Sequence, residues 1–294
     1  MKLNRDIDEV MSAFLDLQKQ LSSFEKDEDR ENFIFNNYVV FNEAFKIIKQ
    51  QIKDGDYCMY YQPQIGMDGK WQGAEALFRM QYDGKPLYPD VVFSLANFFG
   101  IDRGLTLILL DRVCKDMKRI NAETNSNIFV SFNIDCKLID AEFVQKIIRI
   151  VEYNKINPRS LGIELTEISS FDEIRVEDIE TLKSSGFSLL IDDFGAGYAN
   201  ESLVMKLPFD VVKFSEKLVT DIDKPEKNIN YERVKKVMQY CKDNGIKTVA
   251  EHVETKEELN TIRELGIDKV QGWYYFKAMS VEQFIEKYGS SRQC

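Results

Sequence analysis

The stretch YCMYYQPQIGMDGKWQGAEALFRM, residues 57–80, contains two strand-like runs joined by a tight turn. YCMYYQPQIG and WQGAEALFRM have the composition of strands, and Asp68-Gly69 between them is a typical hairpin-turn pair. Glu75 lies within the apolar run of the second strand. A lone buried carboxylate is costly unless it is paired or bound to a metal. The stretch therefore predicts a β-hairpin that carries a functional acid.

Downstream of the hairpin, helix-like and strand-like segments alternate. Two helices are expected between about residues 88 and 120, and later helices end near Gly186, Gly245 and Gly266. The strands expected after them are NIFVSFNI (127–134), SLGIELTEI (160–168), FSLLIDDFG (187–195), FDVVKF (209–214), KTVAEHVE (247–254) and DKVQGWYY (268–275). This order predicts an α/β fold, a parallel (β/α)8 barrel with an irregular beginning. A doubly wound open sheet is the alternative, although no G-x-G-x-x-G motif follows the first strand.

The first 24 residues carry apolar side chains at alternating spacings of four and three. These are Leu3, Ile7, Val10, Phe14, Leu17, Leu21 and Phe24. The spacing predicts an amphipathic helix that packs on its own domain, and a short dimerising coiled coil is the alternative.

Composition narrows the class of protein. The chain has 294 residues, enough for one barrel with an extension, and its net charge of −10 makes a nucleic-acid backbone an improbable partner. The five cysteines are scattered without a C-x-x-C pair, as in proteins of a reducing cytosol. His252 is the single histidine, which argues against a histidine-rich metal site. Because no signal-like start or long apolar run occurs, we expect a soluble, cytoplasmic protein without membrane insertion.

Polar residues stand near the carboxyl ends of the expected strands. They are Glu75, Asn133, Glu164, Glu167, Asp192, Asp193, Lys213, Glu251 and Gln271. In a barrel these ends converge on one mouth, where active sites lie. Oxygen ligands and scarce histidine favour Mg²⁺ or Mn²⁺ over zinc, and the adjacent Asp192 and Asp193 can serve two ions. Two such ions are a common arrangement for splitting phosphate esters, and a lysine beside them can hold water or stabilise developing charge.

Each of these residues also has an ordinary explanation. Asp192-Asp193 before a glycine-bearing loop is often only a turn and a helix cap, and Lys213 is compatible with a surface position. Glu164 and Glu167 are compatible with a charged strand end, and His252 with a packing or hydrogen-bonding role. Their joint occurrence at successive strand ends favours a site.

Seven segments, in order, resemble the EAL-domain cyclic di-GMP phosphodiesterases of bacteria, named for the Glu-Ala-Leu found here at 75–77. The segments are YYQPQIG…GAEALFRM, FVSFNI, IELTEIS, LLIDDFGAGYAN, LPFDVVKF, TVAEHVET and VQGWYYFKAM. The resemblance runs from about residue 40 to the end of the chain. It implies a modified TIM barrel over 38–294 with an antiparallel first strand, and it leaves residues 1–37 as an N-terminal helical extension.

The resemblance also implies a bacterial signalling enzyme, a hydrolase that opens one phosphodiester bond of cyclic di-GMP to give linear pGpG with two Mg²⁺ or Mn²⁺ ions. The first metal would be held by Glu75, Asn133, Glu164 and Asp192, and the second would involve Asp193. Lys213 and Glu251 would handle the water, with Glu251 as the general base, and Glu167 would anchor the loop after Asp193. The implied substrate contacts are Gln62, Leu77, Arg79, Gln271 and Trp273, and Glu254 matches a further acidic position near the mouth. A homodimer through the barrel face near that loop is expected, helped by residues 1–24.

Three positions depart from the family's usual pattern. Ser215 stands where an acid is usual, His252 where glycine is usual, and Ala278 where proline is common. Losing the acid at 215 is expected to weaken the second metal site. Hydrolysis is the first hypothesis, because every direct ligand assigned above is present. The alternatives are a catalytically weak or silent cyclic di-GMP receptor that signals through the N-terminal helix or a partner, and a protein-interaction module that no longer binds the nucleotide.

Overall fold

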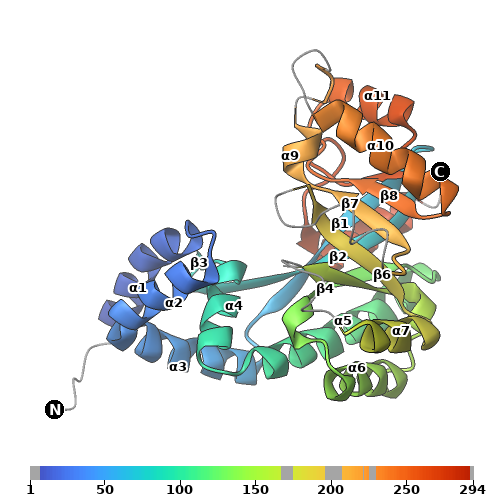
Figure 1. Cartoon of the computed structure of the whole chain (residues 1–294). Helices are drawn as coiled ribbons and strands as arrows, with labels where there is room; N and C mark the ends of the chain where they lie inside the picture. The colour runs from blue at the N-terminus through green and yellow to red at the C-terminus, as the bar shows by residue number, and fades with distance from the viewer. Residues whose placement is uncertain (1–6, 167–174, 196–206, 221, 225–229, 292–294) are drawn as a thin grey trace. The chain divides into compact units, whose positions relative to one another are not determined.

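The computed structural model in Figure 1 describes residues 7–166, 175–195, 207–220, 222–224 and 230–291. The chain forms two units, Met1–Met59 with Phe78–Leu109 and Tyr60–Leu77 with Leu110–Cys294. It passes between them within β1 (Cys58–Gly66), β2 (Trp71–Tyr82) and α5 (Asp102–Thr124).

The first unit is mainly helical. Its complete elements are α1 (Ile7–Ser22), α2 (Asp27–Asn36), α3 (Tyr38–Asp54), β3 (Lys85–Leu87) and α4 (Pro89–Phe98). The apolar stripe of α1 faces this unit, since Val10, Phe14 and Leu21 are buried and the Phe14 ring lies edge-on to Phe41 with centroids 6.0 Å apart. This supports the interpretation of a helix packed on its own chain. The helix α3 ends at Gly55, whose positive φ of 80° forms a left-handed cap.

The predicted hairpin is present as β1 and β2, which pair with each other. The Gly66 amide donates to the Lys70 carbonyl at 2.8 Å across the turn, and Gly69 has a φ of 78°, which glycine adopts at little cost. The strand β1 runs antiparallel to β9 (Lys269–Val270), whereas β2 runs parallel to β4 (Val130–Asp135).

Eight strands close into a ring in the second unit. The remaining members are β5 (Leu161–Thr166), β6 (Ser188–Phe194), β7 (Val211–Phe214) and β8 (Lys247–Ala250). The order β1-β9-β8-β7-β6-β5-β4-β2 returns to β1 through the hairpin pairing, and β3 and β10 (Met279–Ser280) extend it at β2 and β1. From β2 through β4 to β9 every neighbouring pair is parallel, so β1 alone runs the other way among these eight. The predicted barrel with an antiparallel first strand is confirmed, and the open-sheet alternative is wrong.

Helices cover the outside of the ring (Figure 1). Those complete in the second unit are α6 (Ala141–Tyr153), α7 (Val176–Ser184), α9 (Glu216–Val219), α10 (Asn230–Asp243), α11 (Lys256–Leu265) and α12 (Val281–Ser291). Short 3-10 turns at Cys136–Leu138 and Pro158–Ser160 complete the connections around β4 and β5. Local signals explain the helix limits: Thr255 and Glu258 form a capping box at the start of α11, and Gly266 ends it in a left-handed conformation.

Two strands end well before the position that the sequence predicts. The strand predicted over 247–254 stops at Ala250, and the one predicted over 268–275 pairs only at Lys269–Val270. The chain leaves the ladder because His252 has a positive φ of 54° and the Tyr274 amide donates to the Val253 carbonyl at 2.9 Å. The two segments therefore cross closely just beyond the sheet.

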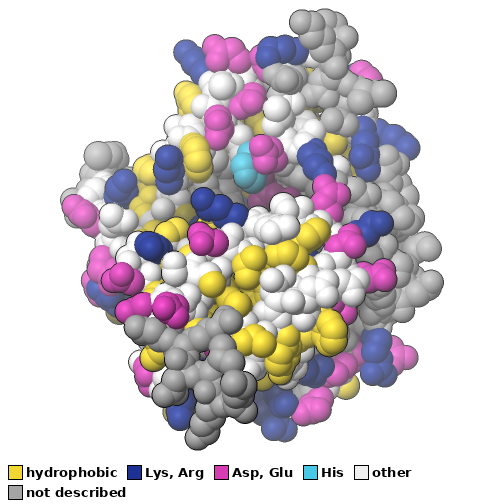
Figure 2. Space-filling view, turned by 90° about the vertical axis from the view of Figure 1, so that its left-hand side faces the viewer, with side chains coloured by type: hydrophobic (Ala, Val, Ile, Leu, Met, Phe, Trp, Pro, Cys, Tyr) yellow, Lys and Arg dark blue, Asp and Glu magenta, His cyan; other side chains and the backbone are white. Residues whose placement is uncertain are grey.

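Surface charge is mixed on the face drawn in Figure 2, where acidic and basic side chains surround a band of hydrophobic ones. Within the described ranges, no helix combines the length and the apolar character needed to cross a bilayer.

Candidate metal centre

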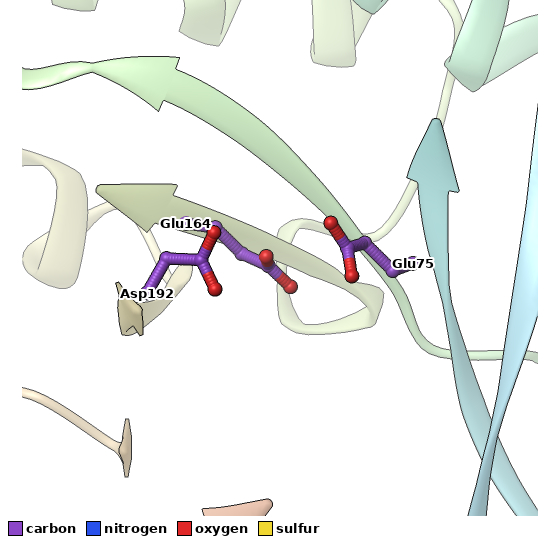
Figure 3. A group of neighbouring side chains, drawn as sticks. All are labelled: Glu75, Glu164 and Asp192. Carbon is purple, nitrogen blue, oxygen red and sulfur yellow. The ribbon is translucent and has the colours of Figure 1, made fainter. Parts of the chain in front are cut away.

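Three carboxylates converge inside the ring. Glu75 comes from β2, Glu164 from β5 and Asp192 from β6, and each offers an oxygen within 4.8 Å of those of the other two. Figure 3 shows their carboxyl groups directed toward a shared space. The strands β2, β4, β5 and β6 are successive neighbours in the sheet and run parallel, which brings these side chains together. Asn133 of β4 pairs in register with Glu164 of β5. The predicted gathering of acids from separate strands is therefore present at these positions.

Lys213 of β7 stands at the centre of this group and its side chain is fully buried. Its Nζ lies 2.6 Å from Glu164 Oε2, 2.7 Å from Asp192 Oδ1 and 3.1 Å from Glu75 Oε2. A fourth carboxylate, Glu251 just after β8, places Oε1 2.8 Å from the same nitrogen. Four carboxylates thus face one ammonium away from solvent, a charge surplus that a further cation would offset.

Two amides hold Glu75 in place. Asn133 Nδ2 donates to Glu75 Oε1 at 2.7 Å, and Gln271 Nε2 donates to Glu75 Oε2 at 2.6 Å. The predicted contact residue Gln62 belongs to the same network: Gln271 Nε2 lies 3.4 Å from Gln62 Oε1, and Gln62 Nε2 donates to the Phe276 carbonyl at 3.2 Å. The amides fix the orientation of Glu75 from both sides.

Gln64 is a member of the network that the sequence interpretation missed. It is fully buried, and its Nε2 donates to Gln271 Oε1 at 3.2 Å. The available signal was the spacing of Gln62 and Gln64, since residues two apart on a strand share a face. Two glutamines on one face of an otherwise apolar strand indicate an interior that is polar.

The pKa values of Glu75 and Glu164 move in opposite directions. Burial alone would raise the pKa of Glu75, but the Lys213 ammonium and the hydrogen bonds from Gln271 and Asn133 hold it below its usual value. Burial, together with the negative charge of Glu75, raises the pKa of Glu164 to about 8 in spite of Lys213. Without a metal, Glu164 therefore holds its proton at neutral pH while Glu75 is ionised.

Burial and neighbouring charge also shift the pKa values of Asp192, Glu251 and Lys213. Burial raises the pKa of Asp192, against the opposing charge of Lys213. Burial also raises the pKa of Glu251 well above its usual value, and the charges of Asp192 and Glu75 add to this effect against Lys213. Burial would lower the pKa of Lys213, but the carboxylates around it, Asp192 first, raise it well above its usual value.

The donor set fits a hard divalent cation. Among the described residues, Asn133 Oδ1 and Glu164 Oε1 are buried oxygens without a hydrogen-bond partner. Such orphaned acceptors are costly unless a cation or a water uses them. Together with Glu75 and Asp192 they form an all-oxygen set, which suits Mg²⁺ or Mn²⁺.

Three further predicted residues lie within three positions along the chain of members of this group. Asp193 is exposed at the irregularity of β6, with a positive φ of 48°, and Ser215 is buried with an unpaired Oγ just after β7. Glu254 is exposed beside the start of α11, where its amide donates to Glu258 Oε2 at 2.9 Å. The hydrogen bonds of Lys213 Nζ go instead to Glu75, Glu164 and Asp192.

The predicted substrate contacts other than the glutamines differ in burial and in their neighbours. Leu77 is half-buried on β2, and Arg79 of the first unit donates from Nη1 to the Phe78 carbonyl at 2.7 Å. Trp273 is 60% exposed, with Lys277 Nζ 4.0 Å from its ring centroid. Glu167, predicted to anchor the loop after Asp193, lies outside the described residues.

His252 lies beside the group but faces away from packing. Its side chain is 57% exposed, and its Nε2 is 3.8 Å from Glu216 Oε2. Of the packing or hydrogen-bonding role expected for His252, the packing role is not found, because the positive φ at 252 turns this side chain outward while Glu251 remains buried.

Comparison of the sequence with known proteins identifies the family. The EAL domain model matches residues 46–278. The chain is 30% identical over 242 residues to the "Probable cyclic di-GMP phosphodiesterase PdeB" of Escherichia coli strain K12, a match that covers 81% of this chain.

Solved structures share the fold. One is the EAL enzyme Bd1971 in its cAMP and cyclic-di-GMP bound form, with a TM-score of 0.78, 18% identity, and coverage of 92% of this chain and 78% of that one. Another is Klebsiella pneumoniae BlrP1 in a manganese and cyclic di-GMP complex, with a TM-score of 0.64, 24% identity, and coverage of 77% and 57%.

The matched region is one part of larger relatives. The chain spans 46%, 31% and 32% of the lengths of the first three curated relatives. The family model nevertheless covers most of this chain, and its fold and its acidic centre agree with that match. The chain belongs to the EAL domain family.

Proposed function

We propose that this chain hydrolyses one phosphodiester bond of cyclic di-GMP to give linear pGpG. The observation that carries the proposal is the convergence of Glu75, Glu164 and Asp192 around buried oxygens that lack partners, in a member of the EAL domain family. PdeB, whose name describes a probable cyclic di-GMP phosphodiesterase, supports the choice of substrate.

The proposed cofactor is a pair of Mg²⁺ or Mn²⁺ ions. Glu75, Asn133, Glu164 and Asp192 would hold the first ion, and Asp193 would contribute to the second. The manganese complex of BlrP1 supports this choice of metal. When bound, such ions neutralise phosphate charge and lower the pKa of a shared water.

The chain's own groups supply the proton chemistry. Glu251 is the proposed base, because it is buried with the other carboxylates and its Oε1 lies 2.8 Å from Lys213 Nζ. Lys213 would stabilise negative charge as it develops on the phosphate. Gln62 and Gln271, already joined to Glu75, would position the substrate, with Leu77, Arg79 and Trp273 as further contacts. Glu167 would anchor the loop after Asp193, and Glu254 would be a further acidic group near the mouth.

A silent cyclic di-GMP receptor is the second candidate function. It is favoured by one observation: Ser215 is buried with an unpaired hydroxyl at the position where the family usually has an acid. Such a receptor would signal through the N-terminal helix or a partner. In both candidates we propose residues 1–37 as an extension to the barrel domain, a homodimer as the assembly, and the cytoplasm as the location.

Incubation with Mn²⁺ or Mg²⁺ and cyclic di-GMP, followed by chromatography, tests the proposal. We expect pGpG to form, and Glu75→Gln to reduce the rate by at least about 100-fold, because it removes a ligand charge from the proposed metal site. Glu286→Gln, an exposed change on α12, is the matched control and should leave the rate unchanged. Nucleotide binding without any pGpG after hours would reject hydrolysis and favour the receptor.

A further inference from the structure

Lys213 contacts the carboxylates of the candidate metal group directly, an arrangement that the proposed hydrolysis does not by itself require. Its ammonium contacts Glu75, Glu164 and Asp192, the same three residues that form the candidate metal group, at 2.6–3.1 Å. The side chain is fully buried, so water does not screen these contacts. A single positive charge of the protein therefore lies where the carboxylates would otherwise bind a metal.

The ammonium of Lys213 has too few N–H donors for all the carboxylates around it. A lysine has three N–H donors, whereas four carboxylates, including that of Glu251, lie within hydrogen-bonding distance of Nζ. In addition, Glu164 Oε1 and Asn133 Oδ1 remain unpaired beside it. The ammonium thus stabilises the buried carboxylates when no metal is bound, and the unpaired oxygens remain as ligands for a divalent ion.

We propose that Lys213 is the internal cation of the metal-free centre and that it competes with the divalent metal for the same carboxylates. Its ammonium allows the barrel to fold with four buried acids before any metal arrives, and it lowers the affinity of the centre for the metal that replaces its contacts. Metal occupancy therefore follows the free concentration of the ion instead of being permanent.

The inference rests on the proposed metal site but not on hydrolysis, so it is tested with MnCl₂ alone. Free Mn²⁺ is counted by electron paramagnetic resonance, and thermal unfolding is followed in EDTA and in saturating Mn²⁺. In Lys213→Gln, which keeps an amide donor but removes the charge, we expect Mn²⁺ to bind at least about tenfold more tightly than in the wild type. We also expect unfolding at a lower temperature in EDTA and a larger upward shift with Mn²⁺.

Lys213→Met, which removes both charge and donors, should show the same pattern more strongly. Lys247→Gln is the matched control: this lysine, at the first residue of the neighbouring strand β8, pairs with Asp268 at 2.8 Å on the surface. Its Mn²⁺ affinity should equal that of the wild type.

Either of two results would overturn the proposal. One is unchanged or weaker Mn²⁺ binding in Lys213→Gln. The other is a failure of both Lys213 variants to fold even in saturating Mn²⁺, since the proposal requires the metal to replace the ammonium. Tighter binding without any pGpG formation by the wild type would support competition while rejecting hydrolysis.

Discussion

Gln271 Nε2 donates a hydrogen bond to Glu75 Oε2 at 2.6 Å, joining the segment after β9 to the middle of β2. Both side chains are buried, so the bond holds an ionised carboxylate without help from solvent. Hydrogen bonds to buried charged groups are stronger than those between neutral groups. This relationship makes the stability of the barrel sensitive to a residue that carries no charge.

Gln271→Leu should destabilise the metal-free protein by about 1–3 kcal/mol, because it leaves Glu75 Oε2 with one donor fewer in a dry site. The free energy of unfolding from urea titration measures this change. Gln239→Leu is the control: Gln239 donates to Asp243 at 2.8 Å on the exposed face of α10, and its loss should cost little. Equal effects of the two substitutions would contradict the assigned role of Gln271.

Metal binding should release a proton from Glu164 near neutral pH. Its pKa of about 8 keeps it protonated at pH 7, and a divalent ion requires the carboxylate. The apparent Mn²⁺ affinity should therefore rise with pH up to about 8 and then level off. Calorimetry in buffers of different ionisation enthalpy counts the protons released. Heats that do not depend on the buffer would be inconsistent with this assignment.

The same shift has a consequence for stability without metal. Because the pKa of Glu164 in the folded state lies above its ordinary value of 4.5, the folded protein binds this proton more tightly than the unfolded chain. The stabilisation is fully present below pH 4.5 and is lost as pH rises through about 8. In Glu164→Gln, the free energy of unfolding measured in EDTA should no longer show the part of the pH dependence that comes from the Glu164 proton.

Ser215→Asp should make the protein depend on metal. The added carboxylate would be buried at a position that is 1% exposed, so we expect a lower unfolding temperature in EDTA and recovery with Mn²⁺. If Ser215 limits hydrolysis, the rate of pGpG formation should also increase. Ser131→Asp places a carboxylate at another fully buried serine, on β4, and Mn²⁺ should not rescue it. An unchanged rate would show that Ser215 does not limit activity.

Gly272→Ala should disrupt the crossing beyond β9. A Cβ at 272 would lie 2.2 Å from the Val253 carbonyl oxygen and 2.3 Å from its amide nitrogen, a clash that only a backbone shift relieves. We expect a loss of at least about 2 kcal/mol and weaker Mn²⁺ binding, because Gln271 is the preceding residue. Gly289→Ala in α12 is the control: no atom lies within 4 Å of its added Cβ, so a small gain in helix stability is expected. Wild-type stability of Gly272→Ala would refute this account.

The fold was largely predictable because its signals are local. The Asp68-Gly69 turn, the capping box of α11 and the glycines that end helices act on neighbouring residues and need no knowledge of the whole chain. The early end of β8 was missed, since it depends on the positive φ of His252, a conformation that residues other than glycine seldom adopt. The glycine usual in the family at this position was the available signal.

The sequence indicated which residues gather at the candidate site, but it did not indicate which of them contact one another. Parallel strands bring their carboxyl ends to one edge, which gathers Glu75, Glu164 and Asp192 whatever their exact partners. The contact of Lys213 with four carboxylates depends on the closure of the ring, which brings β2 and β7 to face each other across the interior. Gln64 was missed because it lies on β1, which runs against its neighbours, so it is not among the polar residues at the carboxyl ends of the parallel strands.

That reversed direction has a practical consequence. Because β1 runs against its neighbours, the turn between Gly66 and Lys70 lies at the base of the barrel, at the end away from the carboxyl ends of the parallel strands. A fluorophore or an epitope grafted into this turn would label the protein at the end of the barrel opposite the acidic group, and would allow immobilisation that leaves the other end open.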